Sequence, residues 1–263
     1  MSREVRLLDD VRPDESDHEF LPGMSRDWLM PWYDLTARFR GLGRLYRRTV
    51  ELAQIGPGER VLDVGCGTGN LSRQVLRAAP DATVTGLDPD GDSLRRAARK
   101  LRRRRRGEVT LVRGFAHRLP VPDASQDHVV SSLALHHVPA EEKERLAVEV
   151  ARVLRPGGRV TVADFGGDHA SAHGHGHEAS GHRHDGGTDG GHGPHRPGGG
   201  HRHRPGAPGR QPGHGPGSGT HDADNADGGI ERLLTAAGLA DARTLERMPL
   251  LGDSVVFVQA RRP

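Results

Sequence analysis

Two patterns of hydrophobic residues alternate along most of this chain. Short apolar runs, each bounded by glycine, proline or charged residues, are followed by longer stretches in which apolar residues recur at every third or fourth position. The short runs are typical of buried strands, and the longer spacing is typical of amphipathic helices. Because a helix separates most pairs of strands, the pattern predicts right-handed crossovers and a parallel sheet with helices on both faces.

The positions of these runs give the expected elements. Parallel strands are expected at residues 60–64, 82–87, 109–112, 127–132 and 159–163. Helices are expected at residues 71–79, 92–106, 140–154 and 230–237. Two more strand-like runs, 242–247 and 254–260, complete the prediction of an α/β domain. Its sheet is expected to be doubly wound, Rossmann-like, mainly parallel and seven-stranded, with an antiparallel C-terminal strand pair.

The chain before the first of these strands divides into two parts. Residues 1–22 are acidic, polar and interrupted by proline, which predicts a flexible leader. Residues 25–55 carry apolar residues at helical spacing and predict amphipathic helices, broken at a proline and again near Gly41–Gly43. Trp28 and Tyr33 lie in this second part, where lining a substrate pocket and packing in the core are equal alternatives.

Residues 166–228 interrupt the pattern of strands and helices. Glycine, histidine and proline fill 38 of these 63 positions. Such a composition cannot bury a core, so we expect a low-complexity, disordered insertion in a single domain made of residues 23–165 and 229–263. Closely spaced histidines in the insertion are candidate ligands for zinc, nickel or copper: His173, His175, His177, His182, His184, His201 and His203.

Cysteine content and the distribution of apolar residues exclude several classes of protein. A single cysteine, Cys66, excludes an intramolecular disulfide and every multi-cysteine zinc or iron–sulfur framework. The charged N-terminus has no apolar segment, so it is not a secretory signal. No apolar run is long enough to span a membrane. We therefore expect a cytoplasmic protein.

Basic residues are concentrated in one segment, although the formal net charge is only +3. The segment Arg95–Arg106 carries nine cations. It is either a solvated helix face or a peripheral contact for an anionic membrane. No stacking aromatic residue accompanies it, which disfavours a nucleic-acid partner.

The most informative pattern is a turn with three alternating glycines. Gly65, Gly67 and Gly69 follow the strand at residues 60–64 and precede a helix, which leaves backbone N–H groups bare where a ligand approaches. Asp88 ends the next strand, 19 residues after the last of these glycines. This is close to the spacing at which a carboxylate meets ribose hydroxyls, so the sequence predicts a nucleoside site; a tight turn that binds nothing is the alternative.

Two residues disfavour a dinucleotide at this turn. Asn70 stands where the dinucleotide fingerprint requires a further glycine. Asp63, within the strand itself, suits a ligand with an ammonium group better than one with a pyrophosphate.

Four segments together resemble the class I S-adenosylmethionine-dependent methyltransferases, especially the group with ubiquinone/menaquinone C-methyltransferases and phospholipid N-methyltransferases. They are Val61–Asn70, Gly86–Asp90, Gly114–Val138 and Leu154–Val160. The resemblance covers residues 25–165 and, more weakly, 229–260. It implies in-line transfer of a methyl group from S-adenosyl-L-methionine to a small-molecule, quinone or lipid acceptor. The alternative is a metal-binding or regulatory module with little or no catalysis.

The resemblance also implies roles for single residues at the cofactor's methionine and ribose. The three glycines of the turn would pass against its methionine part, and Asp63 would lie near its amino group. Asp88 would accept hydrogen bonds from both ribose hydroxyls, and Leu133 would approach the cofactor from the end of another strand.

On the adenine side the resemblance implies Pro89, Phe115 and Ala116. Relatives commonly carry an aspartate at the position of Phe115, and a phenyl ring cannot accept the hydrogen bond of the adenine amino group. Stacking and the backbone of Ala116 would have to hold the adenine instead.

Histidines supply the candidates for proton transfer. His136 and His137 follow the strand at residues 127–132, where one of them would deprotonate or orient an acceptor; a loop histidine bonded to backbone is the alternative. His117 and His128 are expected on the surface.

Overall fold

The structure of the protein is a computed structural model. It describes residues 5–12, 15, 32–102, 108–166 and 225–263, and of residues 32–40 it describes the backbone only.

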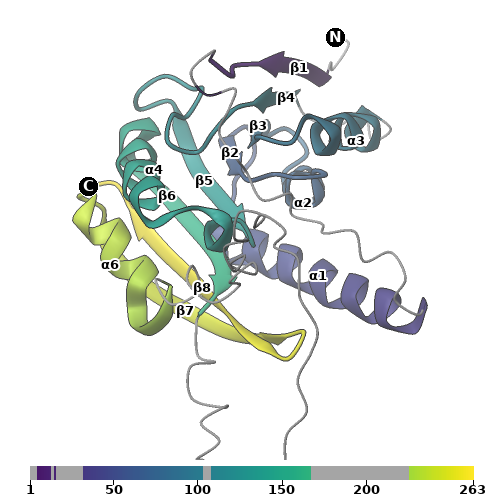
Figure 1. Cartoon of the computed structure of the whole chain (residues 1–263). Helices are drawn as coiled ribbons and strands as arrows, with labels where there is room; N and C mark the ends of the chain where they lie inside the picture. Colours follow the sequence, from purple (N-terminus) through teal and green to yellow (C-terminus); the bar gives the residue numbers. More distant parts are fainter. Residues whose placement is uncertain (1–4, 13–14, 16–31, 103–107, 167–224) are drawn as a thin grey trace, which may run out of the picture. The chain divides into compact units, whose positions relative to one another are not determined.

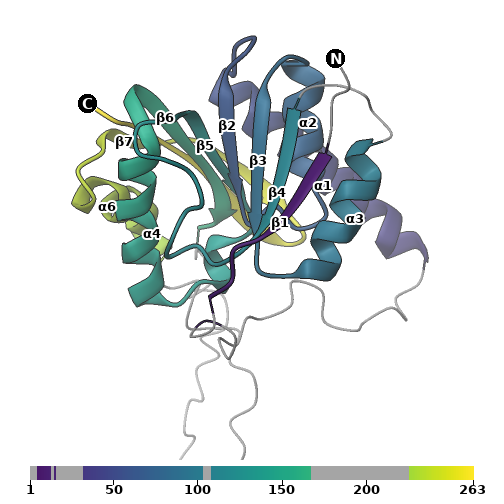
Figure 2. The same cartoon turned by 90° about the horizontal axis from the view of Figure 1, so that it is seen from above.

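Within these residues, strands β1 to β8 form one sheet in the order β1-β4-β3-β2-β5-β6-β8-β7 (Figures 1 and 2). Their bounds are Val5–Asp9, Arg60–Val64, Thr83–Asp88, Glu108–Arg113, Gln126–Ser132, Leu154–Phe165, Ala240–Leu250 and Asp253–Arg261. Strands β1 to β6 run parallel, and β8 pairs antiparallel with both β6 and β7. The predicted doubly wound sheet with an antiparallel C-terminal pair is confirmed.

Helices cover both faces of this sheet (Figure 2). They are α1 (Trp32–Ala53), α2 (Asn70–Ala78), α3 (Gly91–Arg102), α4 (Ala140–Val153) and α6 (Gly229–Ala236). Short 3₁₀ turns lie at Leu135–His137 (η2) and Ala226–Gly228 (η4).

Alternate strand residues form separate apolar clusters on the two faces. Leu62 and Val129 pack in the cluster that contains α4 and α6, whereas their neighbours Val61 and Val130 pack in the cluster of α2, α3 and the end of α1. Because both faces are buried, the strands read in the sequence as continuous apolar runs. Asp63 is two residues after Val61 in the same strand, so its carboxylate points to the same face of the sheet, the one covered by α2.

Strand β1 is an addition to the expected sheet. Val5 to Asp9 pair in parallel with Val109 to Arg113 of β4, so the prediction of a flexible leader is wrong for these residues and the sheet has an eighth strand. Four of the five β1 residues are exposed, including both leucines. An edge strand held by backbone hydrogen bonds, without regular burial of alternate side chains, has no periodic signal in the sequence.

Helix α1 passes without a break through Gly41–Gly43, where the sequence predicted one. A glycine inside a helix costs only about 1 kcal/mol relative to alanine, and packing offsets a cost of this size. A Cβ atom at Gly41 would lie 3.0 Å from the Cδ1 atom of Leu250 in β7. The small residue therefore allows α1 to approach the sheet closely.

Both histidines expected on the surface are partly or wholly buried. The His128 side chain is 6% exposed, and its Nε2 lies 2.8 Å from a Glu59 carboxylate oxygen. The His117 side chain is 16% exposed and lies 2.9 Å from Glu15. That surface prediction is wrong because each imidazole is paired with a carboxylate, which allows a polar ring to be buried.

Glu15 anchors the segment after β1 to the loop after β4. Its carboxylate accepts hydrogen bonds from the Arg12 N–H at 2.8 Å and from Arg118 at 3.3 Å, besides its contact with His117. Burial alone would raise the pKa of Glu15, but these hydrogen bonds outweigh it and lower the pKa from 4.5 to about 2. Arg118 also binds the carboxylate of Asp10 at 2.6 Å.

We expect the docking of β1 to weaken in acid. A carboxylate whose pKa is lowered by folding stabilises the fold above its unfolded value, and this contribution is lost as the pH falls from about 4.5 towards 2. In the Glu15→Gln variant the β1 amides should exchange hydrogen faster at neutral pH, while the amides of β2 and β5 keep their protection. Hydrogen exchange read by mass spectrometry checks this, and unchanged β1 exchange in the variant would contradict the anchoring role.

Candidate active site

The turn between β2 and α2 is held against two neighbouring strands. Gly65 and Cys66 donate backbone hydrogen bonds to the Leu87 carbonyl of β3, at 2.9 and 3.0 Å. A Cβ atom at Gly65 would lie 2.3 Å from the Cβ of Ala134, which only glycine avoids. The turn is therefore in direct contact with the loop after β5, which carries His136.

Gly67, in the middle of the turn, faces open space. Its φ of 49° lies in the left-handed region, and a Cβ built there meets no atom within 4 Å. An open backbone in the left-handed region at the start of a helix is a place where a ligand can approach main-chain atoms closely.

Asp63 lies buried beneath the turn. Its side chain accepts a 2.5 Å hydrogen bond from the Ser72 hydroxyl of α2 through Oδ2. Its other oxygen, Oδ1, is buried and has no hydrogen-bond partner among the described residues. Burial raises the pKa of Asp63 to about 7, and the negative charge of Asp88 adds to this effect. A buried carboxylate oxygen without a donor fits a cationic ligand group such as an ammonium.

Asp88, at the end of β3, connects the next strand to the same turn. Its Oδ2 accepts the Gly67 N–H at 2.7 Å, and its Oδ1 accepts the Asp90 N–H at 2.9 Å. Burial raises the pKa of Asp88 as well. Each carboxylate oxygen has two lone-pair positions, so both oxygens retain the capacity to accept a hydroxyl.

Lys100 of α3 stabilises the turn through hydrogen bonds. Its ammonium group donates to the Thr68 carbonyl at 2.7 Å, to the Thr68 hydroxyl at 3.0 Å and to Asn70 Oδ1 at 2.7 Å. In the sequence Lys100 is one cation of the basic segment, and this role was not predicted. The signal was its position next to the buried Leu101, at the border of the helix's apolar side.

The predicted adenine residues follow β3 and β4. Arg113 donates to the Pro89 carbonyl at 3.2 Å, and the Gly114 N–H donates to the Asp88 carbonyl at 3.2 Å, so the two loops are bound to each other. The Phe115 ring is stacked on His117 with a centroid distance of 5.9 Å and an interplanar angle of 12°. Phe115 and Ala116 thus lie on the loop beside Asp88 and Pro89.

The loop after β5 joins His136 to a buried carboxylate. His136 Nδ1 lies 2.7 Å from Asp164 Oδ1, at the end of β6. Asp164 is fully buried, and it also accepts the N–H groups of Leu135 at 2.7 Å and Phe165 at 2.8 Å. The His137 ring lies against His136, with 3.9 Å between centroids.

A carboxylate accepting from Nδ1–H fixes the imidazole orientation and leaves Nε2 as the basic nitrogen. Asp164, a charged residue that follows the apolar run of β6, was not predicted from the sequence.

Leu133 occupies the position between β5 and this loop. Its φ of 54° is in the left-handed region, which is uncommon for a leucine. Its N–H donates to the Ala163 carbonyl of β6 at 2.9 Å. The bend turns the chain directly after the sheet and places η2, with His136, beside the end of β6.

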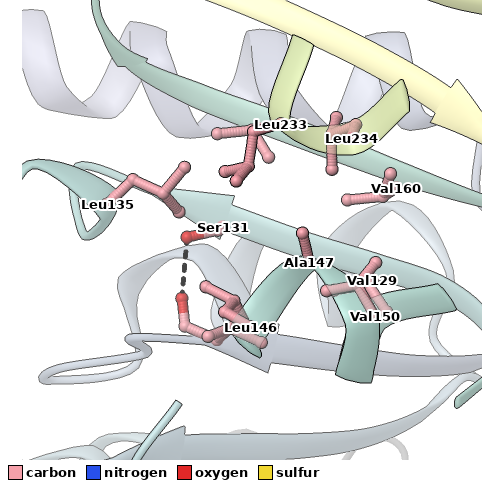
Figure 3. Close-up of a pocket in the computed structure, with 11 residues that line it drawn as sticks. Val129, Ser131, Leu135, Leu146, Ala147, Val150, Val160, Leu233 and Leu234 are labelled. Atoms are coloured by element: carbon pink, nitrogen blue, oxygen red, sulfur yellow. Dashed lines mark hydrogen bonds between the residues drawn. The ribbon is translucent and has the colours of Figure 1, made fainter. Parts of the chain in front are cut away.

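A small cavity lies inside the domain, between the sheet and helices α4 and α6 (Figure 3). Val129, Leu146, Val150 and Leu234 are among its apolar lining residues, and the Ser131 hydroxyl beside it donates to the Val64 carbonyl at 2.9 Å. Its volume of about 20 Å³ has room for about one water molecule. It is a packing void and is too small for a methyl acceptor.

Several predicted site residues lie outside the description. Trp28 and the side chain of Tyr33 are among them, and so are the seven candidate metal ligands in the insertion, His173, His175, His177, His182, His184, His201 and His203. Among the described residues no cluster of three or more metal-ligating side chains occurs. No helix in the described part of the chain is long and apolar enough to cross a membrane. The cytoplasmic location stays a prediction.

Several known proteins are similar to this chain in sequence. Residues 61–158 match the family model described as a methyltransferase domain. The chain is 36% identical over 159 residues to a demethylmenaquinone methyltransferase of Renibacterium salmoninarum. The aligned region covers 59% of this chain and 61% of that protein. The chain is 37% identical over 128 residues to a ubiquinone/menaquinone biosynthesis C-methyltransferase of Ectopseudomonas mendocina, covering 48% and 49%. The chain therefore spans 49% to 61% of the length of these relatives.

Solved structures show the same fold over most of the chain. The magnesium protoporphyrin IX methyltransferase of Synechocystis, crystallised with bound S-adenosylmethionine, gives a TM-score of 0.56 at 16% identity and covers 89% of this chain and 86% of its own. A methyltransferase of Aquifex aeolicus gives 0.51 at 14% identity, covering 81% and 88%. The fold is that of the class I S-adenosylmethionine-dependent methyltransferases.

Proposed function

We propose that this chain, whose residues 61–158 match the family model of a methyltransferase domain, moves a methyl group from S-adenosylmethionine to a small apolar acceptor of the quinone or lipid type. One observation carries the proposal. The glycine turn, with Asp63 beneath it and Asp88 beside it, is in contact through Gly65 and Ala134 with the loop that holds the His136–Asp164 pair. A cofactor site and a candidate base thus adjoin.

The residues of the turn fit the parts of S-adenosylmethionine. Asp63 Oδ1 is a buried acceptor for an ammonium group, and Gly67 leaves room for the methionine chain. Asp88 would accept the ribose hydroxyls, with Pro89, Phe115 and Ala116 around the adenine and Leu133 on the opposite side. When bound, the cofactor supplies a methyl group that its positive sulfur already activates.

Cofactor binding should be coupled to the loss of a proton from Asp63. With a pKa of about 7, its carboxyl is largely protonated at about pH 6, and a bound ammonium favours the ionised form. Binding of S-adenosylmethionine at about pH 6 should therefore release a proton, and affinity should rise as the pH increases towards 7. Isothermal titration in two buffers of different ionisation enthalpy measures this release. The Asp63→Asn variant should bind more weakly and release fewer protons; equal release would contradict the assignment.

At the acceptor side, the chain's own contribution is positioning and proton transfer. Asp164 holds the His136 ring by its Nδ1, so Nε2 is the atom that would take a proton from a hydroxyl or an acidic carbon of the acceptor. His137, in contact with His136, is the second candidate. Alignment of the acceptor and exclusion of water would supply much of the remaining rate enhancement.

The names of the curated relatives support a quinone-type acceptor. A direct test uses S-adenosylmethionine labelled in its methyl group, incubated with the full chain and, separately, with a demethylated naphthoquinol, a phospholipid and a simple phenol. Label in the naphthoquinol alone supports the quinone assignment. Label in only one of the other two acceptors overturns it and names the acceptor class instead.

Composition supports a second function for the histidine-rich insertion, as a loose site for zinc, nickel or copper. Motifs such as the one at residues 173–177 place imidazoles two residues apart, a pattern typical of histidine-rich tracts that bind metal ions weakly. Isothermal titration of the full chain with Ni²⁺ should give heat at neutral pH. A variant with His173, His175 and His177 changed to Asn should give less, and equal heat would place the metal elsewhere.

A further inference from the structure

Helix α3 separates its apolar and basic residues completely. Leu94, Ala97, Ala98 and Leu101 are buried against the sheet. The exposed side carries four arginines: Arg95, Arg96, Arg99 and Arg102. The remaining cation of the helix, Lys100, is directed to the glycine turn.

Strand β1 extends this basic surface with apolar residues. Leu7 and Leu8 are 46% and 52% exposed, and they are two of the four large hydrophobic residues exposed in the described chain. β1 is the edge strand of the sheet and lies beside α3 (Figure 2), where Arg102 reaches the Val5 carbonyl at 3.5 Å. Successive side chains of a strand point to opposite faces of the sheet, so Leu7, opposite Leu111 of the α3 cluster, lies on the side of α3, whereas Leu8, opposite Val112, lies on the side of α4. We call the four arginines and Leu7 the α3–β1 face.

Few acidic groups neutralise the α3–β1 face. Asp92 pairs with Arg95 at 2.5 Å, and the charge of Arg96 acts on Asp90. Asp9 of β1 is paired with Arg113 at 3.4 Å. In the part of the chain that the structure describes, no ion pair involves Arg99 or Arg102. The face therefore presents net positive charge next to the exposed Leu7.

We infer that the α3–β1 face binds the surface of an anionic lipid bilayer. Guanidinium groups are attracted to lipid phosphates, and Leu7 gains by entering the interfacial region, so the two kinds of side chain act together on a membrane. On a nucleic acid Leu7 would gain nothing, and the described face has no aromatic ring to stack on a base. The inference does not depend on methyl transfer, although a bilayer is where a lipid-like acceptor is found.

The test is sedimentation of the full chain with vesicles. Phosphatidylcholine vesicles with about 30% phosphatidylglycerol should carry the protein into the pellet, and phosphatidylcholine alone should not. Binding should fall steeply between about 50 and 500 mM salt, because the Debye length shortens. The Arg99→Gln/Arg102→Gln variant should bind about 25-fold more weakly, at roughly fivefold for each arginine.

Matched variants locate the contact. Arg47→Gln/Arg77→Gln removes the same charge from exposed positions of α1 and α2 and should bind as the unchanged protein does. Leu7→Ser should weaken binding without altering its dependence on salt. Three results would overturn the inference: equal binding to neutral vesicles, equal loss in the two arginine variants, or tighter binding to a DNA duplex than to anionic vesicles at the same salt. Cofactor binding, measured separately, reports on the proposed function.

Discussion

The Asp88→Ala variant is expected to bind S-adenosylmethionine and S-adenosylhomocysteine at least about 100-fold more weakly than the unchanged protein. The substitution removes the acceptor of both proposed ribose hydrogen bonds, and hydrogen bonds to a charged group contribute about 1.5–3 kcal/mol each. It also removes the acceptor of the Gly67 N–H, which now lies 2.7 Å from Asp88 Oδ2, so the glycine turn loses one of its supports. Isothermal titration of both ligands measures the loss.

A nearby aspartate provides the control for this variant. Asp92 is exposed, lies on α3 and pairs only with Arg95 among the described residues. Asp92→Ala should keep the affinity of the unchanged protein within about twofold, because an exposed ion pair contributes little. If Asp88→Ala stays folded and binds the cofactor as tightly as Asp92→Ala does, the assignment of Asp88 to the ribose is wrong.

The His136→Ala variant is expected to lose about 100- to 10,000-fold in turnover, provided that the acceptor carries an acidic proton. The affinity for S-adenosylhomocysteine should stay within about threefold, because the proposed role of His136 is towards the acceptor and not the cofactor. His137→Ala is the comparison: a smaller loss identifies His136 as the base, and the reverse order would assign the proton to His137. Methyl transfer and cofactor titration are measured on the same preparations.

Asp164 is proposed to position His136. Its variant is therefore tested by the pH dependence of the reaction as well as by the rate. Asp164→Asn keeps the size of the side chain but removes the charge that favours Nδ1–H of His136. We expect a lower kcat and a shift of the acidic limb of the pH–rate profile to lower pH, because the imidazolium loses its carboxylate partner. A rate loss with an unchanged pH profile would indicate that Asp164 only supports the backbone of Leu135 and Phe165.

The central part of this fold could be predicted because its strands are buried on both faces. In runs such as Val61 to Val64, apolar and polar residues do not alternate as they do in a strand with one exposed face, and each run is bounded by a turn residue. The bounds of β2 and the start of α4 agree with the sequence prediction. The same logic fails for β1, whose exposed leucines and backbone pairing leave no period in the sequence.

The residues of the candidate site were likewise predictable only in part. Asp63, Asp88 and the glycines were found because their spacing along one β-turn-α-β unit is local in the sequence. Asp164 and Lys100 were missed because their partners lie 28 and 30 to 32 residues away, so only the packing of separate elements brings them together. For Lys100 the helical position beside Leu101 was available as a signal, but a run of nine cations concealed it.

The claim that this chain binds S-adenosylmethionine at the glycine turn is tested most directly by titrating S-adenosylhomocysteine into the folded full chain. Saturable binding to a single site is expected, lost in Asp88→Ala and retained in Asp92→Ala. Absence of saturable heat at two temperatures, from protein that unfolds cooperatively on warming, would contradict it.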